Sequence, residues 1–504
     1  MKERHFRADD DSLQGYLALA ENQFELERES TQDSRLALYD TFDWRLYRKG
    51  FFACAVPGSF LVRKAFAASP HLECEMEVIP KTWDRFENER LRSFMKDILG
   101  DRALLPLLDF EVREENFAAR NEDHKIICRL STLTPASDGG RPYLLIKPLK
   151  GYARESEPLY ALAAESAMEE LRTSILEELL RAQGIHPGEY SSKLDVRLDK
   201  GQTITEAALV ILHHLLSTMK INIPGIIADY DTEFLHDFRV ASRRTRACLS
   251  QLKEALPRDA AKKYNKDFKN IAQRCNVLRD LDVFLLEKQR YYDLLPQHLH
   301  RGLDSYFAHV RRDRKSRQKK FTAFLQGEDF KSILDDWEGF LAHPETPGGS
   351  DPAIAVARKR IYGRFRKIIN EGRKITDASP DRDLHTLRIE CKKLRYLLEF
   401  SKSLFPAAKM KKLVQHLKDF QDNLGEFNDL TMQQINLKEY LERSSGEPRR
   451  NQLESAAIGG LLAALHNRQI EVREEFCQRF ADFDSKEIHS LYEELFKRGK
   501  GRAS

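Results

Sequence analysis

The sequence predicts an α+β unit followed by a larger all-helical unit, and three observations support this prediction. Short strand-like runs separated by turn residues fill the region from about residue 22 to 150. After about residue 200 the apolar residues recur with the helical period of 3.6, and strand signals disappear. Within this second region, one pattern of basic residues occurs twice at a constant displacement, which indicates a duplication.

Five runs in the first region have the alternation and turn boundaries of strands. They are FELERE at 24–29, FFACAV at 51–56, FLVRK at 60–64, HKIICRL at 124–130 and PYLLIKPL at 142–149. A helix is expected over 157–183, because the segment is apolar at helical spacing and ends before Gly184 and Pro187. The sequence therefore predicts an α+β or barrel domain with inserted helices.

The expected domain boundaries follow from these changes of pattern. An N-terminal domain is placed at 1–195 and a helical domain at 196–504. The breaker cluster HPETPGGSDP at 343–352 has the composition of a linker. It divides the helical domain into halves at 200–342 and 353–504.

Composition favours an ordinary globular protein of the cytoplasm. Charged residues make up 32% and hydrophobic residues 41% of the 504 residues, which excludes a disordered chain. The seven cysteines lack CxxC or other zinc-type spacing, and their odd number argues against a disulfide framework. No apolar signal core opens the sequence, and its longest apolar stretch, 207–216, contains two histidines. We expect neither export nor membrane insertion.

The net charge of +4 hides an asymmetry between the two regions. Residues 1–200 contain 29 Lys and Arg against 36 Asp and Glu, a net charge of −7, whereas residues 201–504 contain 54 against 43, a net charge of +11. A basic helical region is suited to an anionic partner. A solvated basic surface would give the same totals, so charge alone leaves both interpretations open.

The internal repeat relates three separated features by one displacement. His236 opens HDFRVASRRTR and His385 opens HTLRIECKKLR, 149 residues later. The same displacement carries Lys269 onto Lys418 and Asp280 onto Asp429. A shared offset of this kind predicts two structurally equivalent halves with a pseudo-two-fold arrangement.

Helical geometry places the basic residues of each copy on one stripe. Positions 0, +3, +7 and +10 fall within about 80° of one another on an α-helix, because each residue turns the helix by about 100°. The two predicted stripes are His236, Arg239, Arg243 and Arg246, and His385, Arg388, Lys392 and Arg395. If the two helices face each other, they line a basic groove.

Such a stripe favours a phosphate-rich anion. Like charges at helical spacing repel by about 0.2–0.5 kcal/mol per pair, so a repeated stripe indicates a compensating anion. Arginine forks match phosphate oxygens, and a histidine can donate from either ring nitrogen. Only Tyr396 adds an aromatic ring, so base stacking has little support. Capping or core roles are the alternative for the histidines, and the repeat favours binding.

Other charged residues are given supporting roles. Asp280 and Asp429 are expected to pair with basic residues and fix their rotamers, rather than to act as catalytic acids. The run RRDRKSRQKK at 311–320 has the pattern of a solvated helix face or an extension of the groove. In ARKRIYGRFRK at 357–367, Arg360, Arg364 and Lys367 share one face, and the first two join the candidate binding set.

The motifs HDFRVASRRTR (236–246), NVLRDLD (276–282), HTLRIECKKLRY (385–396) and FQDNLGEFND (420–429) together resemble the CHAD family. The resemblance covers about residues 200–500. It implies an all-α domain of two pseudo-symmetric four-helix bundles around a basic channel, with inorganic polyphosphate as the ligand. The binding set that it implies is His236, Arg239, Arg243, Arg244 and Arg246, with His385, Arg388, Lys392, Lys393 and Arg395. Lys269 and Lys418 complete our candidate set through the repeat.

The N-terminal region resembles a diverged member of the CYTH group of triphosphate-tunnel barrels. The segments that carry the resemblance are ELE at 25–27, LYDTFDWRLYRKG at 38–50, ECEME at 73–77 and PYLLIKPLKGY at 142–152. That family has an ExExK strand, whereas here Glu25 and Glu27 are followed by Glu29. The paired arginines of the family are also absent at 51–56. A structural or docking role is therefore favoured over metal-dependent hydrolysis.

The leading functional hypothesis is a non-catalytic protein that binds inorganic polyphosphate, resides in the cytoplasm on polyphosphate granules, and docks granule proteins through its N-terminal domain. It needs no metal or other cofactor and no catalytic residue, and specific nucleic-acid or membrane partners are not expected. The alternative is a metal-dependent triphosphatase or polyphosphatase that uses Glu25 and Glu27. Histidine phosphotransfer is a weaker enzymatic hypothesis, because the chain lacks a Gly-rich ATP-binding segment.

Overall fold

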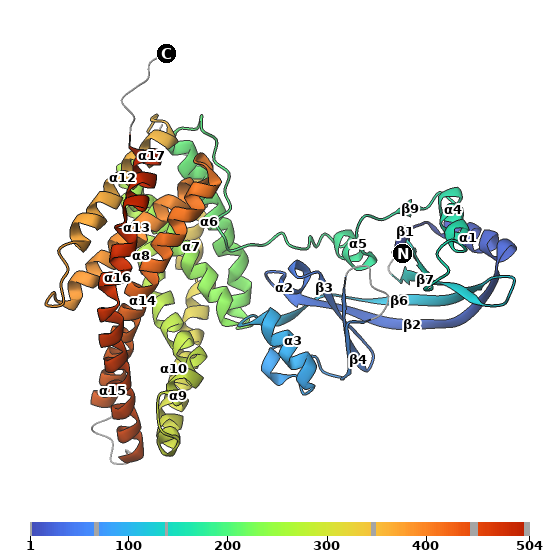
Figure 1. Cartoon of the computed structure of the whole chain (residues 1–504), viewed down its shortest axis with the longest axis horizontal. Coiled ribbons are helices and arrows are strands. Elements are labelled where there is room, and N and C mark those ends of the chain that lie inside the picture. Colours follow the sequence, from blue (N-terminus) through green and yellow to red (C-terminus); the bar gives the residue numbers. More distant parts are fainter. Residues whose placement is uncertain (1–2, 65–69, 137–139, 344–348, 444–451, 498–504) are drawn as a thin grey trace. The chain divides into compact units, whose positions relative to one another are not determined.

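The computed structural model describes residues 3–64, 70–136, 140–343, 349–443 and 452–497. The chain forms two compact units, Met1–Ser191 and Ser192–Ser504. The first is an α+β unit built on an antiparallel sheet, and the second is helical, so the predicted fold class is confirmed (Figure 1).

Nine strands form the sheet of the N-terminal unit, in the order β5-β4-β3-β2-β6-β7-β8-β1-β9, with antiparallel pairing throughout. Two strands of 17 residues, β2 and β6, form its centre, and a register shift interrupts their pairing between Arg28 and Ser30. The strands are β1 (Arg4–Arg7), β2 (Glu25–Thr41), β3 (Phe51–Val56), β4 (Ser59–Lys64), β5 (Leu72–Glu75), β6 (Leu104–Arg120), β7 (Ile126–Pro135), β8 (Tyr143–Pro148) and β9 (Glu169–Glu170).

The five predicted strands all occur, and β2 extends well beyond its predicted run, whereas β6 was not predicted. Polar residues from Glu27 to Arg35 continue β2, and the run from Asp109 to Asn116 gives β6 a similarly polar middle. The side chains of this β2 stretch are largely exposed, whereas in β6 Phe110 and the buried Val112 alternate with polar residues. Pairing with β6, rather than burial, therefore holds the β2 stretch extended.

The helices of this unit pack against the sheet in separate clusters. They are α1 (Asp10–Gln23), α2 (Arg45–Arg48), α3 (Glu89–Leu99), α4 (Glu157–Glu165) and α5 (Ile175–Ala182). Helices α1 and α4 share one core with β6, β7 and β8, and α3 shares another with β3 and β4. The single helix predicted over 157–183 is wrong: α4 ends at Glu165, Ala167 takes a positive φ of 56°, and β9 intervenes.

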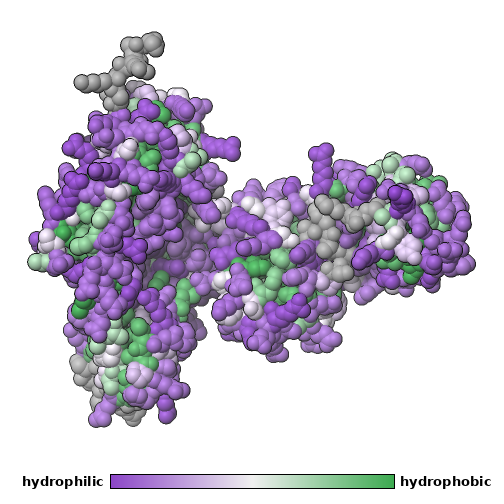
Figure 2. Space-filling model, in the orientation of Figure 1, coloured by the Kyte–Doolittle hydropathy of each residue, from purple (hydrophilic) through white to green (hydrophobic). Residues whose placement is uncertain are grey.

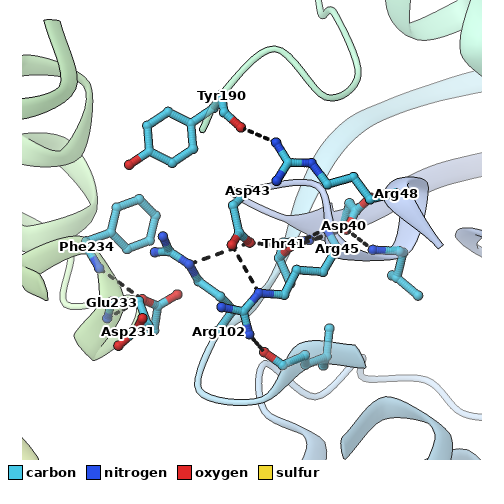
Figure 3. Close-up of polar contacts among 12 residues, drawn as sticks. Asp40, Thr41, Asp43, Arg45, Arg48, Arg102, Tyr190, Asp231, Glu233 and Phe234 are labelled. Carbon is cyan, nitrogen blue, oxygen red and sulfur yellow. Dashed lines mark hydrogen bonds and ion pairs between the residues drawn. The ribbon is translucent and has the colours of Figure 1, made fainter. Parts of the chain in front are cut away.

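The YDTFDWRLYRKG segment forms a tight turn around a buried carboxylate. Asp40 accepts backbone hydrogen bonds from Thr41 at 2.6 Å and from Leu46 and Tyr47 at 2.9 Å, and burial raises its pKa to about 6. Beside it, Asp43 pairs with two arginines, Arg45 at 3.0 Å and Arg102 at 3.6 Å (Figure 3). These contacts fix the local backbone, so this segment has a structural role in the unit.

The helical unit contains long antiparallel helices and short connecting ones. They are α6 (Ile204–Ile227), α7 (Thr232–Gln251), α8 (Arg258–Leu286), α9 (Lys288–Asp293), α10 (His300–Gln326), α11 (Glu328–Ala342), α12 (Ala353–Gly372), α13 (Asp381–Ser401), α14 (Ala407–Arg443), α15 (Gln452–Glu474), α16 (Phe476–Phe483) and α17 (Lys486–Phe496). Aromatic side chains fill each half: Phe268 lies edge-on to Trp337 in the first, and Phe365 stacks on Tyr492 at 3.8 Å in the second. The visible surface is mainly hydrophilic, with scattered apolar patches (Figure 2).

Helix α6 is a core helix of this unit. Among the described residues it alone combines the length and apolar composition of a membrane span, and half of its apolar window is buried inside the protein. It starts at a capping box in which Thr203 and Glu206 satisfy each other's backbone groups. Its neighbours are α7, α10, α11 and α12, which accounts for its apolar faces.

The two halves of the helical unit pack directly on each other through α7 and α13, α6 and α12, and α10 and α15. Part of the predicted linker, 344–348, lies outside the described residues. Its last residues are held at the start of α6, because Ile204 donates to the carbonyl of Asp351 and Thr203 pairs with Pro352. The halves therefore form one unit rather than two independent bundles.

Gly302 of α10 provides a test of this close packing. A Cβ there would lie 2.4 Å from the carbonyl oxygen of Leu453 and 2.7 Å from the Cβ of Ala457, both on α15. Because a backbone carbonyl cannot move aside, we expect Gly302→Ala to lower the free energy of unfolding by about 1–3 kcal/mol. Gly363→Ala is the matched control, since its Cβ meets nothing within 4 Å, and should raise stability by about 0.5–1 kcal/mol. Urea denaturation, monitored by the circular dichroism signal of the helices, measures the free energy of unfolding of both variants. Equal effects of the two substitutions would contradict the close packing at Gly302.

Candidate functional site

A cleft of about 1160 Å³ opens within the helical unit between the repeated helices. Its basic floor comes from α7 and α13, and its sides come from α8, α9 and α14. Helices α7 and α13 pack against each other, so the predicted arrangement of two facing helices is present. The cleft is also large enough for an extended ligand.

The apolar faces of α7 and α13 determine which residues reach this cleft. On α7, Leu235, Phe238 and Cys248 are buried in the core. On α13, Leu387 and Leu394 have the same role. With one face of each helix anchored in this way, the basic stripe at helical spacing turns toward the cleft.

Four basic side chains form the centre of the cleft, and we call them the central cluster: Arg239, Arg243, Arg388 and Lys392. They form two pairs at the repeat displacement of 149, because Arg239 corresponds to Arg388 and Arg243 corresponds to Lys392. The duplication therefore brings together equivalent groups from the two halves.

The contacts of the central cluster leave most of its charge available. Arg239 donates from Nε to the side-chain oxygen of Asn276 at 2.7 Å, and Arg243 lies 5.8 Å from the ring of Tyr396. Within the described part of the chain, Arg239, Arg243 and Lys392 form no ion pair with a carboxylate. The Nε atoms of Arg243 and Arg388 are buried and have no hydrogen-bond partner among the described residues. These donors are positioned for an acceptor from outside the protein.

Burial and mutual repulsion act on the charges of the cluster. Desolvation lowers the pKa of Lys392 to about 7, assisted by the positive charges of Arg388 and Arg243. Burial also lowers the pKa of Arg239 and of Arg388, and in both cases Arg243 adds repulsion. The two arginines remain protonated because of their high intrinsic basicity. Lys392 is thus the member of the cluster that titrates near neutral pH.

Glu399 neutralises the cations at one edge of the cleft. It accepts from Arg244 at 2.9 Å, an ion pair whose side chains are only 14% and 16% exposed. It also accepts from Arg395 at 2.8 Å, and these two arginines lower its pKa despite its burial. Arg244 and Arg395 both line the cleft and share this one carboxylate, so their combined charge is only partly compensated.

Acidic side chains of α8 and α14 lie opposite the central cluster. Asp429 accepts from Arg388 at 3.3 Å, and Asp280 acts on Arg239 by its charge. Asp429 thus contacts a basic residue, whereas Asp280 forms no ion pair among the described residues, so the supporting roles of the two aspartates stay predictions. Together with Glu426 they give the sides of the cleft a negative character, while the floor remains positive.

Several predicted site residues lie outside the cleft lining. His236 belongs to the lining, whereas His385 is exposed and contacts Asn428 through Nδ1 at 2.6 Å. Arg360 pairs with Glu254, and Arg364 and Lys393 pair with the buried Glu390. The remaining residues outside the lining are Arg246, Lys269 and Lys418.

Some residues of the cleft were not among the predicted binding residues. Arg279, Arg290 and Lys193 add basic groups, and Asn276 supplies the partner of Arg239. Arg279 and Asn276 lie within the quoted motif NVLRDLD, so their position on the helix facing α7 was the available signal. Arg290 sits on the short helix α9, and no repeat or spacing in the sequence singles it out.

The carboxylates required by the enzymatic alternative do not converge in the N-terminal unit. Glu25 contacts the ring of His124 at 2.5 Å, and Glu27 pairs with Arg120 at 2.8 Å. Glu29 lines the cavity of about 450 Å³ in this unit, whereas Glu25 and Glu27 do not. In the residues that the structure describes, no group of three His, Cys, Asp or Glu side chains is arranged to hold a metal ion. The geometry therefore does not fit a magnesium site at Glu25 and Glu27.

Comparisons with known proteins place the helical unit in a family. Residues 210–438 match the family model of the CHAD domain. No curated protein matches the chain. Solved structures with similarity include the CHAD domain from the plant Ricinus communis, at 22% identity and a TM-score of 0.48, covering 61% of this chain and 96% of that one.

Two other similar structures cover different shares of the chain. PptA from Streptomyces chartreusis has 16% identity and a TM-score of 0.43, over 55% of this chain and 99% of that one. PH1819 from Pyrococcus horikoshii OT3 has 16% identity and a TM-score of 0.22, over 36% of this chain and 98% of that one. On the match of its sequence to the family model, the helical unit of this protein contains a CHAD domain, at residues 210–438.

Proposed function

We propose that the helical unit binds inorganic polyphosphate in the cleft, through the central cluster of Arg239, Arg243, Arg388 and Lys392. CHAD domains are associated with polyphosphate, and the basic cleft supports the same ligand here. The observation that carries the proposal is the placement of four half-buried cations, equivalent in pairs, around one open cavity.

The energetics of the cluster favour a multivalent anion. Buried like charges destabilise the ligand-free protein, as the lowered pKa of Lys392 shows. A chain of phosphates relieves this repulsion at several positions at once and offers acceptors to the unpartnered Nε donors of Arg243 and Arg388. The folded protein already holds these charges in position, so binding costs little additional ordering of the side chains.

The acidic sides of the cleft favour a thin ligand. A single phosphate chain can follow the basic floor while staying away from Asp280, Glu426 and Asp429. A nucleic-acid duplex would bring its second strand toward these carboxylates, which repel phosphates. Tyr396 is already covered by Arg243, so it offers no open face for base stacking.

The wider assignment follows from this binding role. The protein acts without catalysis in the cytoplasm, on polyphosphate granules, and the acidic N-terminal unit docks granule proteins. As part of the same proposal, the N-terminal unit is a diverged member of the CYTH group. The pairing of Glu25 with His124 and of Glu27 with Arg120 supports a non-catalytic role.

Removal of two central charges tests the site. We expect Arg243→Ala/Lys392→Ala to weaken the binding of long-chain polyphosphate at least about tenfold, because two charge-assisted contacts are lost. The slope of log affinity against log salt concentration should fall by about 1.4, or about 0.7 for each lost phosphate contact. Isothermal titration calorimetry at several salt concentrations measures both quantities.

The matched control removes the same charge from elsewhere on the unit. Arg312 and Lys319 are exposed on α10 and do not line the cleft. Arg312→Ala/Lys319→Ala should leave the affinity within about twofold, because neither side chain lines the cleft and salt screens exposed charges. Equal losses in the two double variants would show that net charge, not the cleft, determines binding. A further variant, His236→Ala/His385→Ala, measures how much the two histidines contribute to polyphosphate affinity, independently of the central cluster.

The titration of Lys392 predicts a pH dependence of binding. Its pKa is about 7 in the free protein, and bound phosphates raise it, so binding takes up a proton. Affinity should therefore increase by about tenfold from pH 8 to pH 6. Lys392→Arg stays charged throughout and should bind with a flatter profile. Isothermal titration calorimetry from pH 6 to pH 8 measures the difference between the two proteins. Long polyphosphate chains are used so that the titration of terminal phosphates contributes little. Identical pH profiles of wild type and Lys392→Arg would refute the role of Lys392.

A further inference from the structure

The N-terminal unit encloses a second cavity, of about 450 Å³, that the polyphosphate proposal does not use. Side chains from seven strands, β1 to β4 and β6 to β8, line it together with α5. The sheet must therefore curve around this space. A cavity of this size within one unit is in the usual range for small-molecule sites.

Most of the cavity wall is apolar. Leu36, Leu61 and Val112 project into it from three strands, and Leu133 and Leu176 extend the apolar wall. Leu36, Leu61 and Val112 are buried, while Leu133 and Leu176 are partly exposed. An apolar surface that surrounds open space is suited to a hydrocarbon or aromatic group.

The opposite end of the cavity is polar, but its groups largely satisfy one another. Asn116 donates to Ser30 at 3.1 Å and accepts from Ser131 at 2.5 Å, which forms a ladder across three strands. Arg129 pairs with Glu29 at 3.4 Å. Lys147 on β8 lies opposite Arg129 and also lines the cavity, and it forms no ion pair among the described residues.

Arg63 is the exception, because it combines an apolar setting with an unsatisfied charge. It lies on β4 opposite Phe52 and on the same face as Leu61. Its Nε is buried without a hydrogen-bond partner, and no described carboxylate forms an ion pair with it. Its charge acts on the buried thiol of Cys54, whose pKa burial nevertheless raises to about 11. A cation in such a place needs an external anion.

We propose that this cavity binds an amphipathic molecule with a single anionic group, a carboxylate or a phosphate, whose headgroup contacts Arg63 and whose apolar body lies against Leu36, Val112 and Leu133. A triphosphate does not fit the same space. It would bring several charges against an apolar wall and toward Glu29 and Glu114, which also line the cavity. Lys64 and Lys147 also line the cavity, but Lys64 is exposed and Lys147 lies opposite Arg129, whereas Arg63 shares a strand face with Leu61.

Calorimetric titration of the full-length protein with decanoate, decyl phosphate and decanol tests the proposal. We expect both anions to bind and decanol to bind at least about tenfold more weakly, since it cannot neutralise Arg63. Arg63→Met should weaken the anions about tenfold and leave decanol unchanged. The preferred anion identifies the headgroup as carboxylate or phosphate.

Two further variants separate the cavity from general effects. Arg113→Met is the matched control, because that arginine is 60% exposed on β6 and does not line the cavity. Leu133→Trp should weaken decanoate and decanol alike by filling the apolar end, with circular dichroism as the check of folding. No decanoate binding at millimolar concentration, or equal binding by wild type and Arg63→Met, would overturn the proposal. Displacement of decanoate by tripolyphosphate would also overturn it, and none of these outcomes bears on binding in the helical cleft.

Discussion

The burial of like charges between α7 and α13 is the constraint on which the architecture of the helical unit depends. Arg239, Arg243, Arg388 and Lys392 repel one another at a site where water screens them poorly. Burial, followed by repulsion from Arg388 and Arg243, lowers the pKa of Lys392 to about 7. Such an arrangement persists only when the helices that carry it are held rigidly. The aromatic cores around Trp337 and Tyr492, and the close contacts between the halves, provide that support.

The surroundings of the cluster show how the same fold separates binding charge from structural charge. Glu399 is shared by Arg244 and Arg395, and Glu390 is shared by Arg364 and Lys393. The pairs of Arg244 and Arg364 connect helices, and within the central cluster only Arg388 forms an ion pair among the described residues. A cleft in which every cation was paired would have lower self-repulsion and correspondingly less to gain from an anion.

The sequence predicted the stripe because helical spacing alone determines which residues share a face. The repeat displacement then paired Arg239 with Arg388 and Arg243 with Lys392, and the structure places all four in one cleft. The ion pairs of Arg360 and Arg364 depend on Glu254 and Glu390, whose proximity arises from tertiary packing, so spacing could not show that these arginines are occupied. In the N-terminal unit, the exposed middle of β2 carries no apolar alternation, and only its pairing with β6 defines it as a strand.

The helical cleft and the N-terminal cavity are suited to anions of different kinds. In the helical cleft, several cations face an open, polar space, and a long anion gains from contacts repeated along its length. In the N-terminal unit, one arginine stands at an apolar wall, so the charge of the ligand determines its orientation and its apolar surface contributes to affinity. A phosphate chain matches the first environment because it remains hydrated on its open side. It does not suit the second because its charges would lose that hydration against Leu36, Leu61 and Val112 and would also meet carboxylates of the lining.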